Sequence, residues 1–154
     1  MLHRNRATRS ASRRAFTLIE LLVTLAIIAV LASIVAPALF GNIGDARMKS
    51  AKSQIQVLAL ALDAYRLDLG DYPTTDQGLQ ALRETPADVP AERWHGPYLR
   101  QVVPTDPWGR PYVYASPGNE NADAYDLYTL GKDGRIGGEG ESADITSWNG
   151  PVRQ

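Results

Sequence analysis

The chain opens with a polar, arginine-rich stretch and then becomes apolar abruptly. Residues 16–40 hold 25 positions and a single ionisable side chain, that of Glu20. At ~1.5 Å per residue, a helix of that length covers about 37 Å, more than the roughly 30 Å hydrocarbon core of a bilayer. We therefore expect residues 16–40 to form a helix that can cross a membrane.

A second pattern follows, in which apolar residues recur at spacings of four and three. They are Ala51, Ile55, Leu58, Leu62, Tyr65 and Leu69. This spacing puts them on one face of a helix. Gly70 predicts the end of that helix, and Pro37 predicts a kink in its first half. Residues 16–69 thus predict one long, gently bent helix whose second half is the spine of a soluble domain.

The remainder of the chain predicts a small mixed domain. One short helix is expected at residues 76–83, with Asp76 as its cap. Residues 111–115 and 124–130 are rich in Tyr, Val and Leu, and predict antiparallel strands joined by a turn at 116–121. Helices first and strands later favour an α+β fold, in which the long helix packs on a small C-terminal antiparallel sheet.

Charge divides the chain at the same place as hydropathy. Residues 1–15 carry five arginines and no acid, and the remaining residues sum to −6, within a total of −1. The positive-inside rule places the arginine-rich end in the cytoplasm and the acidic body across the membrane. The near-neutral total argues against a nucleic-acid binder. The absence of cysteine excludes disulfides, thiolate metal sites and cysteine nucleophiles.

Three interpretations of the apolar segment remain open on hydropathy alone. One is a plain signal anchor, and another is a secretory signal peptide cleaved after Ala38, although the usual apolar region is only roughly 7–15 residues long. The third depends on Glu20, because a carboxylate at the bilayer centre costs about 2.5–3.5 kcal/mol and is a functional candidate. A cut before Phe16 would create an α-amine about 6 Å from Glu20 along the helix. The amine of a neighbouring copy could neutralise Glu20 and set the register of an assembly.

Residues 15–20, Ala-Phe-Thr-Leu-Ile-Glu, resemble the processing site of type IV pilins and of the pseudopilins of type II secretion. The resemblance implies that a prepilin peptidase removes the basic leader, residues 1–15, by cleaving between Ala15 and Phe16. It further implies N-methylation of Phe16 and gives Glu20 the role of the family's assembly glutamate. Ala15 stands where the family nearly always has Gly; since Ala is the next smallest residue, we still expect cleavage there.

Three later blocks are similar, in order and spacing, to the major pseudopilins of type II secretion. They are residues 72–82, 96–99 and 104–109. The likeness covers roughly residues 15–149 and implies a non-enzymatic subunit of a periplasmic fibre, the pseudopilus, that drives export of folded proteins across the outer membrane. The implied partners are further copies in a helical homo-oligomer, minor pseudopilins, an inner-membrane platform with its ATPase, the prepilin peptidase and a secretin. Within 104–109, Asp106 to Gly109 predicts a turn with Trp108 packed on the core.

The resulting organisation has three parts. They are the leader 1–15, a transmembrane or fibre-core helix 16–40 and a periplasmic domain 41–154, in a single-pass protein of the inner membrane. Neither His3 nor His95 has a partner that suggests catalysis. The alternatives are a minor pseudopilin, a type IV pilin, or a monomeric membrane-anchored periplasmic binding domain whose acidic loop captures a ligand.

The C-terminal loop, residues 130–145, is the candidate metal site. Five of its sixteen residues are Gly and four are acidic. Gly lets backbone carbonyls turn toward a centre, and carboxylates supply the hard oxygens that calcium prefers. The spacing is not that of an EF-hand, so the residues alone favour a solvated acidic loop over a calcium site.

The resemblance changes that balance, because the major pseudopilins bind calcium in this loop. Pilins commonly close this region with a disulfide. A chain without cysteine needs another cross-link in its place. Carried over by position, Asp133 and Asp144 match ligand carboxylates and Leu130 matches a carbonyl donor. Ala143 stands where some members have a second Asp. The missing carboxylate at this position could be replaced as a ligand by Glu139, Glu141, Ser142 or water.

Overall fold

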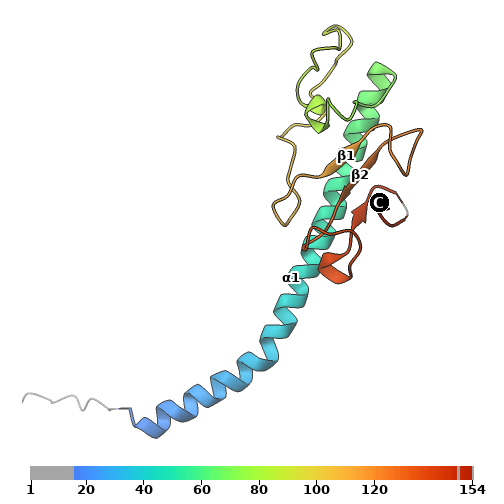
Figure 1. The fold of residues 1–154 in the computed structure, drawn as a ribbon. Coiled ribbons are helices and arrows are strands. Elements are labelled where there is room, and N and C mark those ends of the chain that lie inside the picture. Colours follow the sequence, from blue (N-terminus) through green and yellow to red (C-terminus); the bar gives the residue numbers. More distant parts are fainter. Residues whose placement is uncertain (1–15, 149, 154) are drawn as a thin grey trace, which may run out of the picture. The chain divides into compact units, whose positions relative to one another are not determined.

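The computed structural model describes residues 16–148 and 150–153, with the backbone alone for residues 36–42. The leader, and Ala15 with it, lies outside the described residues. The chain divides into two compact units, one ending at Leu39 and the other beginning at Phe40. The second unit holds the sheet and the core (Figure 1).

The first element is the long helix α1, Leu18–Leu69, of 52 residues. Its helical assignment is continuous through Pro37. The helix ends as predicted at Gly70, whose N–H donates to the Arg66 carbonyl at 2.8 Å and whose φ of 97° is left-handed. The predicted long helix is confirmed.

Three short strands form an antiparallel sheet in the order β1-β2-β3. They are β1 (Val113–Ala115), β2 (Asp126–Thr129) and β3 (Ile145–Thr146). In the register, Tyr114 lies opposite Leu127 and Thr129 lies opposite Ile145. The predicted pair of strands and the α+β class are confirmed. β3 was not predicted, because two residues are too few to show an alternating pattern.

The core forms between α1 and the sheet, which lie side by side in Figure 1. The predicted stripe on α1 is buried from Ala51 to Tyr65, and Leu69 is half-buried. The sheet and the loops contribute the other buried apolar side chains, which include Leu79, Leu82, Leu99, Tyr112, Tyr125, Leu127 and Ile145. Trp108 packs against this core, as predicted. Each fully buried Leu adds about 1.5–3 kcal/mol, so the stripe is what holds the domain to α1.

The short helix expected at 76–83 is a 3₁₀ helix, η1, Leu79–Leu82, preceded by a turn. Asp76 is not its cap. Thr74 and Gln77 instead form a reciprocal pair, in which Gln77 N–H donates to Thr74 Oγ1 at 3.3 Å and Thr74 N–H donates to Gln77 Oε1 at 2.9 Å. Gly78 follows with a positive φ of 59°, so the chain cannot start an α-helix before Leu79.

Candidate functional site

The N-terminal end of the described chain holds Phe16, which sequence analysis assigned to processing, and Glu20, which it assigned to assembly. Phe16 precedes the helix and is 81% exposed. Glu20 lies in the first turn of α1 and is also exposed. A carboxylate in the first turn interacts favourably with the positive end of the helix dipole. Both groups are therefore open to contact with another molecule.

Thr17 caps this end of the helix, and sequence analysis had not identified it. Its Oγ1 accepts a hydrogen bond from Glu20 N–H at 3.2 Å. The signal was present, because a Thr followed three residues later by Glu is the pattern of a capping box. α1 begins at Leu18, so a cut before Phe16 would leave the whole helix and its cap intact.

The first half of α1 is suited to an apolar environment. Residues Leu18–Val35 have a mean hydropathy of 2.8 and, within the described residues, form the one helix long and apolar enough to span a membrane. The hydroxyls of Thr24 and Ser33 donate to the carbonyls of Glu20 and Val30, each at 2.7 Å. Both hydroxyls are therefore satisfied within the helix and need no hydrogen bond to water, which is the condition for polar groups on a lipid-exposed helix. Every residue from Leu18 to Val35 is exposed, so no described part of the chain covers this apolar segment.

The second candidate site is the loop that joins β2 to β3. Its two arms approach so closely at Gly131 that a Cβ there would lie 2.8 Å from the carbonyl oxygens of Glu141 and Ala143. The φ of Gly131 is 62°, a left-handed value that also favours Gly. Lys132 N–H donates to the Glu141 carbonyl at 2.8 Å and joins the arms further. The loop is therefore closed at its base by backbone contacts.

The predicted ligand residues lie in different surroundings within this loop. Leu130 follows β2 directly, and Asp133 is exposed, with Oδ1 accepting from Arg135 N–H at 3.1 Å. Asp144 is half-buried. Its Oδ2 accepts from Gly137 N–H at 2.8 Å, whereas its Oδ1 is buried and has no hydrogen-bond partner.

The other acidic residues of the loop divide between solvent and an ion pair. Glu139 is exposed and precedes the short 3₁₀ helix η2, Gly140–Ser142, without a side-chain cap. Glu141 Oε2 lies 3.0 Å from Lys132 Nζ, so this carboxylate already has a cation. Among the described residues, no three Asp, Glu or His side chains gather where they could hold a metal. A metal here would depend on carbonyl oxygens and water as well as carboxylates.

The chemistry of the loop is nevertheless compatible with calcium. The donors are all oxygens, which calcium prefers in sets of six to eight. The unpartnered Oδ1 of Asp144 is the observation that favours a cation here, because a buried polar atom left unpaired costs about 1–3 kcal/mol and more when charged. A bound cation would remove that cost.

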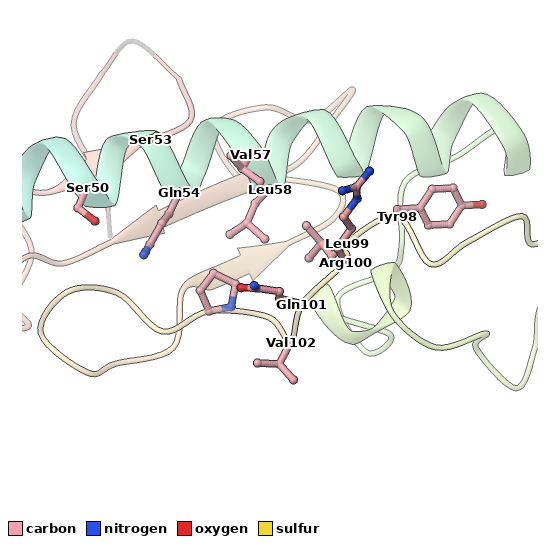
Figure 2. Close-up of a pocket in the computed structure, with 11 residues that line it drawn as sticks. Ser50, Ser53, Gln54, Val57, Leu58, Tyr98, Leu99, Arg100, Gln101 and Val102 are labelled. Carbon is pink, nitrogen blue, oxygen red and sulfur yellow. The ribbon is translucent and has the colours of Figure 1, made fainter.

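An open groove runs between α1 and the segment 98–104 (Figure 2). Ser53, Gln54 and Leu58 line it from the helix, and Val102 lines it from the facing segment. Val57 and Val102 are 53% and 77% exposed and give the groove an apolar rim. Such a rim favours contact with another protein surface.

His95 lies at the surface, outside the residues that line this groove. Its Nδ1 is 3.5 Å from Asp68 Oδ2, and Tyr98 OH donates to the same oxygen at 2.8 Å. His95 is exposed, and its contacts anchor the loop to α1. The contacts of His95 and Tyr98 with Asp68 therefore serve the packing of this loop.

Two family models match the chain. The model described as type II secretion system (T2SS), protein G, matches residues 38–148, and the prokaryotic N-terminal methylation motif matches residues 10–36. The second match includes the predicted processing site and Glu20. Together the two models cover both the first half of α1 and the domain with its loop.

Individual relatives agree with the family models. The chain is 47% identical to type II secretion system core protein G of Vibrio cholerae over 135 residues, which is 87% of this chain and 90% of that protein. It is 45% identical to the Escherichia coli K12 protein of the same name over 137 residues, 88% and 91% of the two chains. The crystal structure of the major pseudopilin from the type 2 secretion system of enterohaemorrhagic Escherichia coli superposes with a TM-score of 0.56. That structure shares 38% identity and covers 71% of this chain and 93% of its own.

Proposed function

Because the chain belongs to the type II secretion system protein G family, the major pseudopilins, we propose that it polymerises into a helical periplasmic fibre that pushes folded proteins across the outer membrane. The observation that carries this proposal is the uncovered apolar half of α1, whose side chains from Leu18 to Val35 are all exposed. Burying such a surface against copies of itself, or against lipid, is strongly favourable.

Glu20 supplies the specificity of assembly in this proposal. It is the one ionisable side chain in residues 16–40, and it is exposed in the first turn. After a prepilin peptidase cuts before Phe16, the new N-methylated α-amine of one subunit pairs with Glu20 of its neighbour. An unpaired charge in an apolar surrounding is costly, so the pairing favours the fibre over the lone subunit and sets the axial register.

The anchor and charge pattern support a location. One apolar helix at the N-terminal end fits a single-pass membrane protein. We place it in the inner membrane with the leader in the cytoplasm and residues 41–154 in the periplasm, because the five arginines of residues 1–15 favour the cytoplasmic side.

The proposal makes the subunit a structural protein with no reaction of its own. Membership of the pseudopilin family implies assembly with other components of the secretion system. We assign these as minor pseudopilins, the platform with its ATPase, and the secretin. Each would act on the fibre through contacts rather than through chemistry at a site in this chain.

Calcium completes the proposal as a staple for the loop between β2 and β3. Asp144 would bind through its unpartnered Oδ1, with the Asp133 carboxylate and the Leu130 carbonyl as further ligands. Glu139, Ser142 and water are the remaining candidates, while Glu141 is engaged by Lys132. The bound cation would supply a cross-link that a chain without cysteine cannot make by a disulfide.

The test of assembly compares Glu20→Gln with Thr24→Val in cells that overproduce the full chain. Glu20→Gln keeps the shape and removes the charge, so we expect normal processing and no fibres. Thr24→Val changes a polar side chain one turn further along and should retain fibres. Mass spectrometry of the N-terminus reads processing independently. A Glu20→Gln variant that forms wild-type fibres would refute the pairing, and an unprocessed Met1 terminus in the wild type would refute the pathway.

A further inference from the structure

The side chain of Arg110 binds the first arm of the loop between β2 and β3. Its Nη1 donates to the Gly131 carbonyl at 2.7 Å and its Nη2 donates to the Lys132 carbonyl at 2.9 Å. The guanidinium also lies against Gly134, where a Cβ would stand 3.0 Å from Arg110 Cζ. Two consecutive carbonyls are therefore held by one planar fork, an arrangement that a single-point cation such as Lys cannot reproduce.

Arg110 is itself held in place by a buried carboxylate. Asp106 is 3% exposed, and its Oδ1 accepts from the backbone N–H of Trp108 at 3.0 Å and of Arg110 at 2.8 Å. The other oxygen accepts from the hydroxyl of Thr129, the last residue of β2. The turn that carries Arg110 is thus fastened to the strand from which the loop departs.

We infer that Arg110 is a positioning residue that orders the first arm of the loop before any metal binds. Gly131 and Lys132 lie between Leu130 and Asp133, the carbonyl donor and the carboxylate of the proposed calcium site. Fixing the two intervening carbonyls restricts the backbone on both sides of them. The predicted effect of Arg110 on calcium affinity rests on the calcium proposal. Its effect on the order of the first arm does not, because that order is a property of the metal-free chain.

The direction in which calcium affinity changes when Arg110 is removed distinguishes a positioning role from a purely electrostatic one. A guanidinium near a calcium site repels the cation, so electrostatics alone predicts tighter calcium binding when Arg110 is removed. Positioning predicts weaker binding. Arg135 provides the matched control, because it carries the same charge, lies within the loop to which Arg110 binds, is exposed, and makes no side-chain hydrogen bond in the part of the chain that the structure describes.

The experiment uses the full chain in detergent micelles, as wild type, Arg110→Ala, Arg110→Lys and Arg135→Ala. Amide hydrogen exchange of residues 131–134 is measured with EGTA present, and calcium affinity is measured by titration calorimetry with calcium chloride. For Arg110→Ala we expect exchange faster by about tenfold and a calcium Kd higher by about tenfold, the usual range when a supporting contact behind a metal ligand is lost. Arg110→Lys should have an exchange rate and a calcium Kd between those of the wild type and Arg110→Ala. Arg135→Ala should leave the exchange rate unchanged and the calcium Kd equal or lower.

Hydrogen exchange and calcium titration test the two proposals independently. If Arg110→Ala matches Arg135→Ala in exchange, Arg110 does not order the arm and the inference is wrong. If the wild type binds no calcium, the calcium proposal fails, and the exchange comparison in EGTA alone decides the role of Arg110. Circular dichroism reports whether each variant is folded; should Arg110→Ala unfold, the milder Arg110→Lys decides by the same criterion.

Discussion

The side chain of Glu141 lies directly on the backbone of α1 at Gly44. A Cβ at Gly44 would stand 2.7 Å from Glu141 Cγ and 2.8 Å from its Cδ, distances that real side chains do not tolerate. Glu141 also pairs with Lys132 at 3.0 Å. This contact joins the proposed calcium loop to the helix close to the point where the soluble domain begins.

A Cβ at Gly44 should therefore have different effects in two backgrounds. Alone, Gly44→Ala forces the flexible Glu141 side chain off the helix and away from Lys132, so we expect the gain in stability from the helix propensity of Ala to be reduced or lost. With Glu141→Ala already present, the overlap is gone, and Gly44→Ala should stabilise by about 1 kcal/mol through propensity. Chemical denaturation of the four chains gives the coupling. Equal effects of Gly44→Ala in both backgrounds would show that the contact has no energetic weight.

Removing calcium should lower the melting temperature of the wild type and leave Asp144→Asn unaffected. The variant keeps the shape of Asp144 but loses the charge of the buried oxygen that we assign to the metal. Metal binding is coupled to folding, so the stabilisation exists only while the site is loaded. Thermal melts with calcium and with EGTA test this. An identical wild-type melt in both conditions would contradict the calcium proposal.

Alkaline pH should unfold the domain between about pH 10 and 12, because buried tyrosines resist ionisation. Burial raises the pKa of Tyr98 and Tyr125 to about 12, and it raises the pKa of Tyr112 and Tyr114 as well. Below the unfolded value near 10 both states are protonated and stability is complete; above it only the unfolded chain ionises. Stability is then lost as the pH rises toward the folded pKa.

Tyr125→Phe tests this titration directly. Its hydroxyl makes no hydrogen bond in the described part of the chain, so the variant removes one titrating group and little else. We expect a shallower loss of stability above pH 10 than in the wild type, measured by denaturation at fixed pH values. A parallel pH dependence of the two proteins would show that Tyr125 ionises alike in the folded and unfolded states.

The two faces of the second half of α1 should respond differently to truncation. Leu62 is fully buried, and Leu62→Ala should cost about 2–5 kcal/mol through lost burial and a residual cavity. Leu67 lies on the same helix but is 87% exposed, so Leu67→Ala should change stability by no more than about 0.5 kcal/mol. Urea denaturation of both variants measures the difference. Similar costs at the two positions would mean that the core lies elsewhere.

The elements with a long repeat were the ones that sequence analysis predicted well. The stripe from Ala51 to Leu69 gave the helix, its buried face and its end at Gly70. The errors were local and short. Asp76 was expected to cap a helix, but the pairing of Thr74 with Gln77 and the left-handed Gly78 delay the turn of helix to Leu79. A four-residue element offers too little periodicity to reveal such a competition.

At the candidate sites, the sequence identified the residue types but not their partners. Glu20 and the acidic loop were recognised from composition and resemblance. The sequence did not show that Glu141 faces Lys132 and α1, or that Asp144 keeps a buried oxygen unpaired. It treated the turn after Asp106 as packing alone, whereas that turn carries the side chain that binds two loop carbonyls.

The sequence by itself determined the apolar half of α1, the buried stripe of its second half and the first two strands, because each follows from the covalent spacing of side chains along a regular backbone. Only the tertiary structure decided which groups meet across the chain. The contact of Gly44 with Glu141 and the grip of Arg110 on Gly131 and Lys132 join segments with no common periodicity. Such contacts arise when the sheet packs on α1, and no local pattern records them.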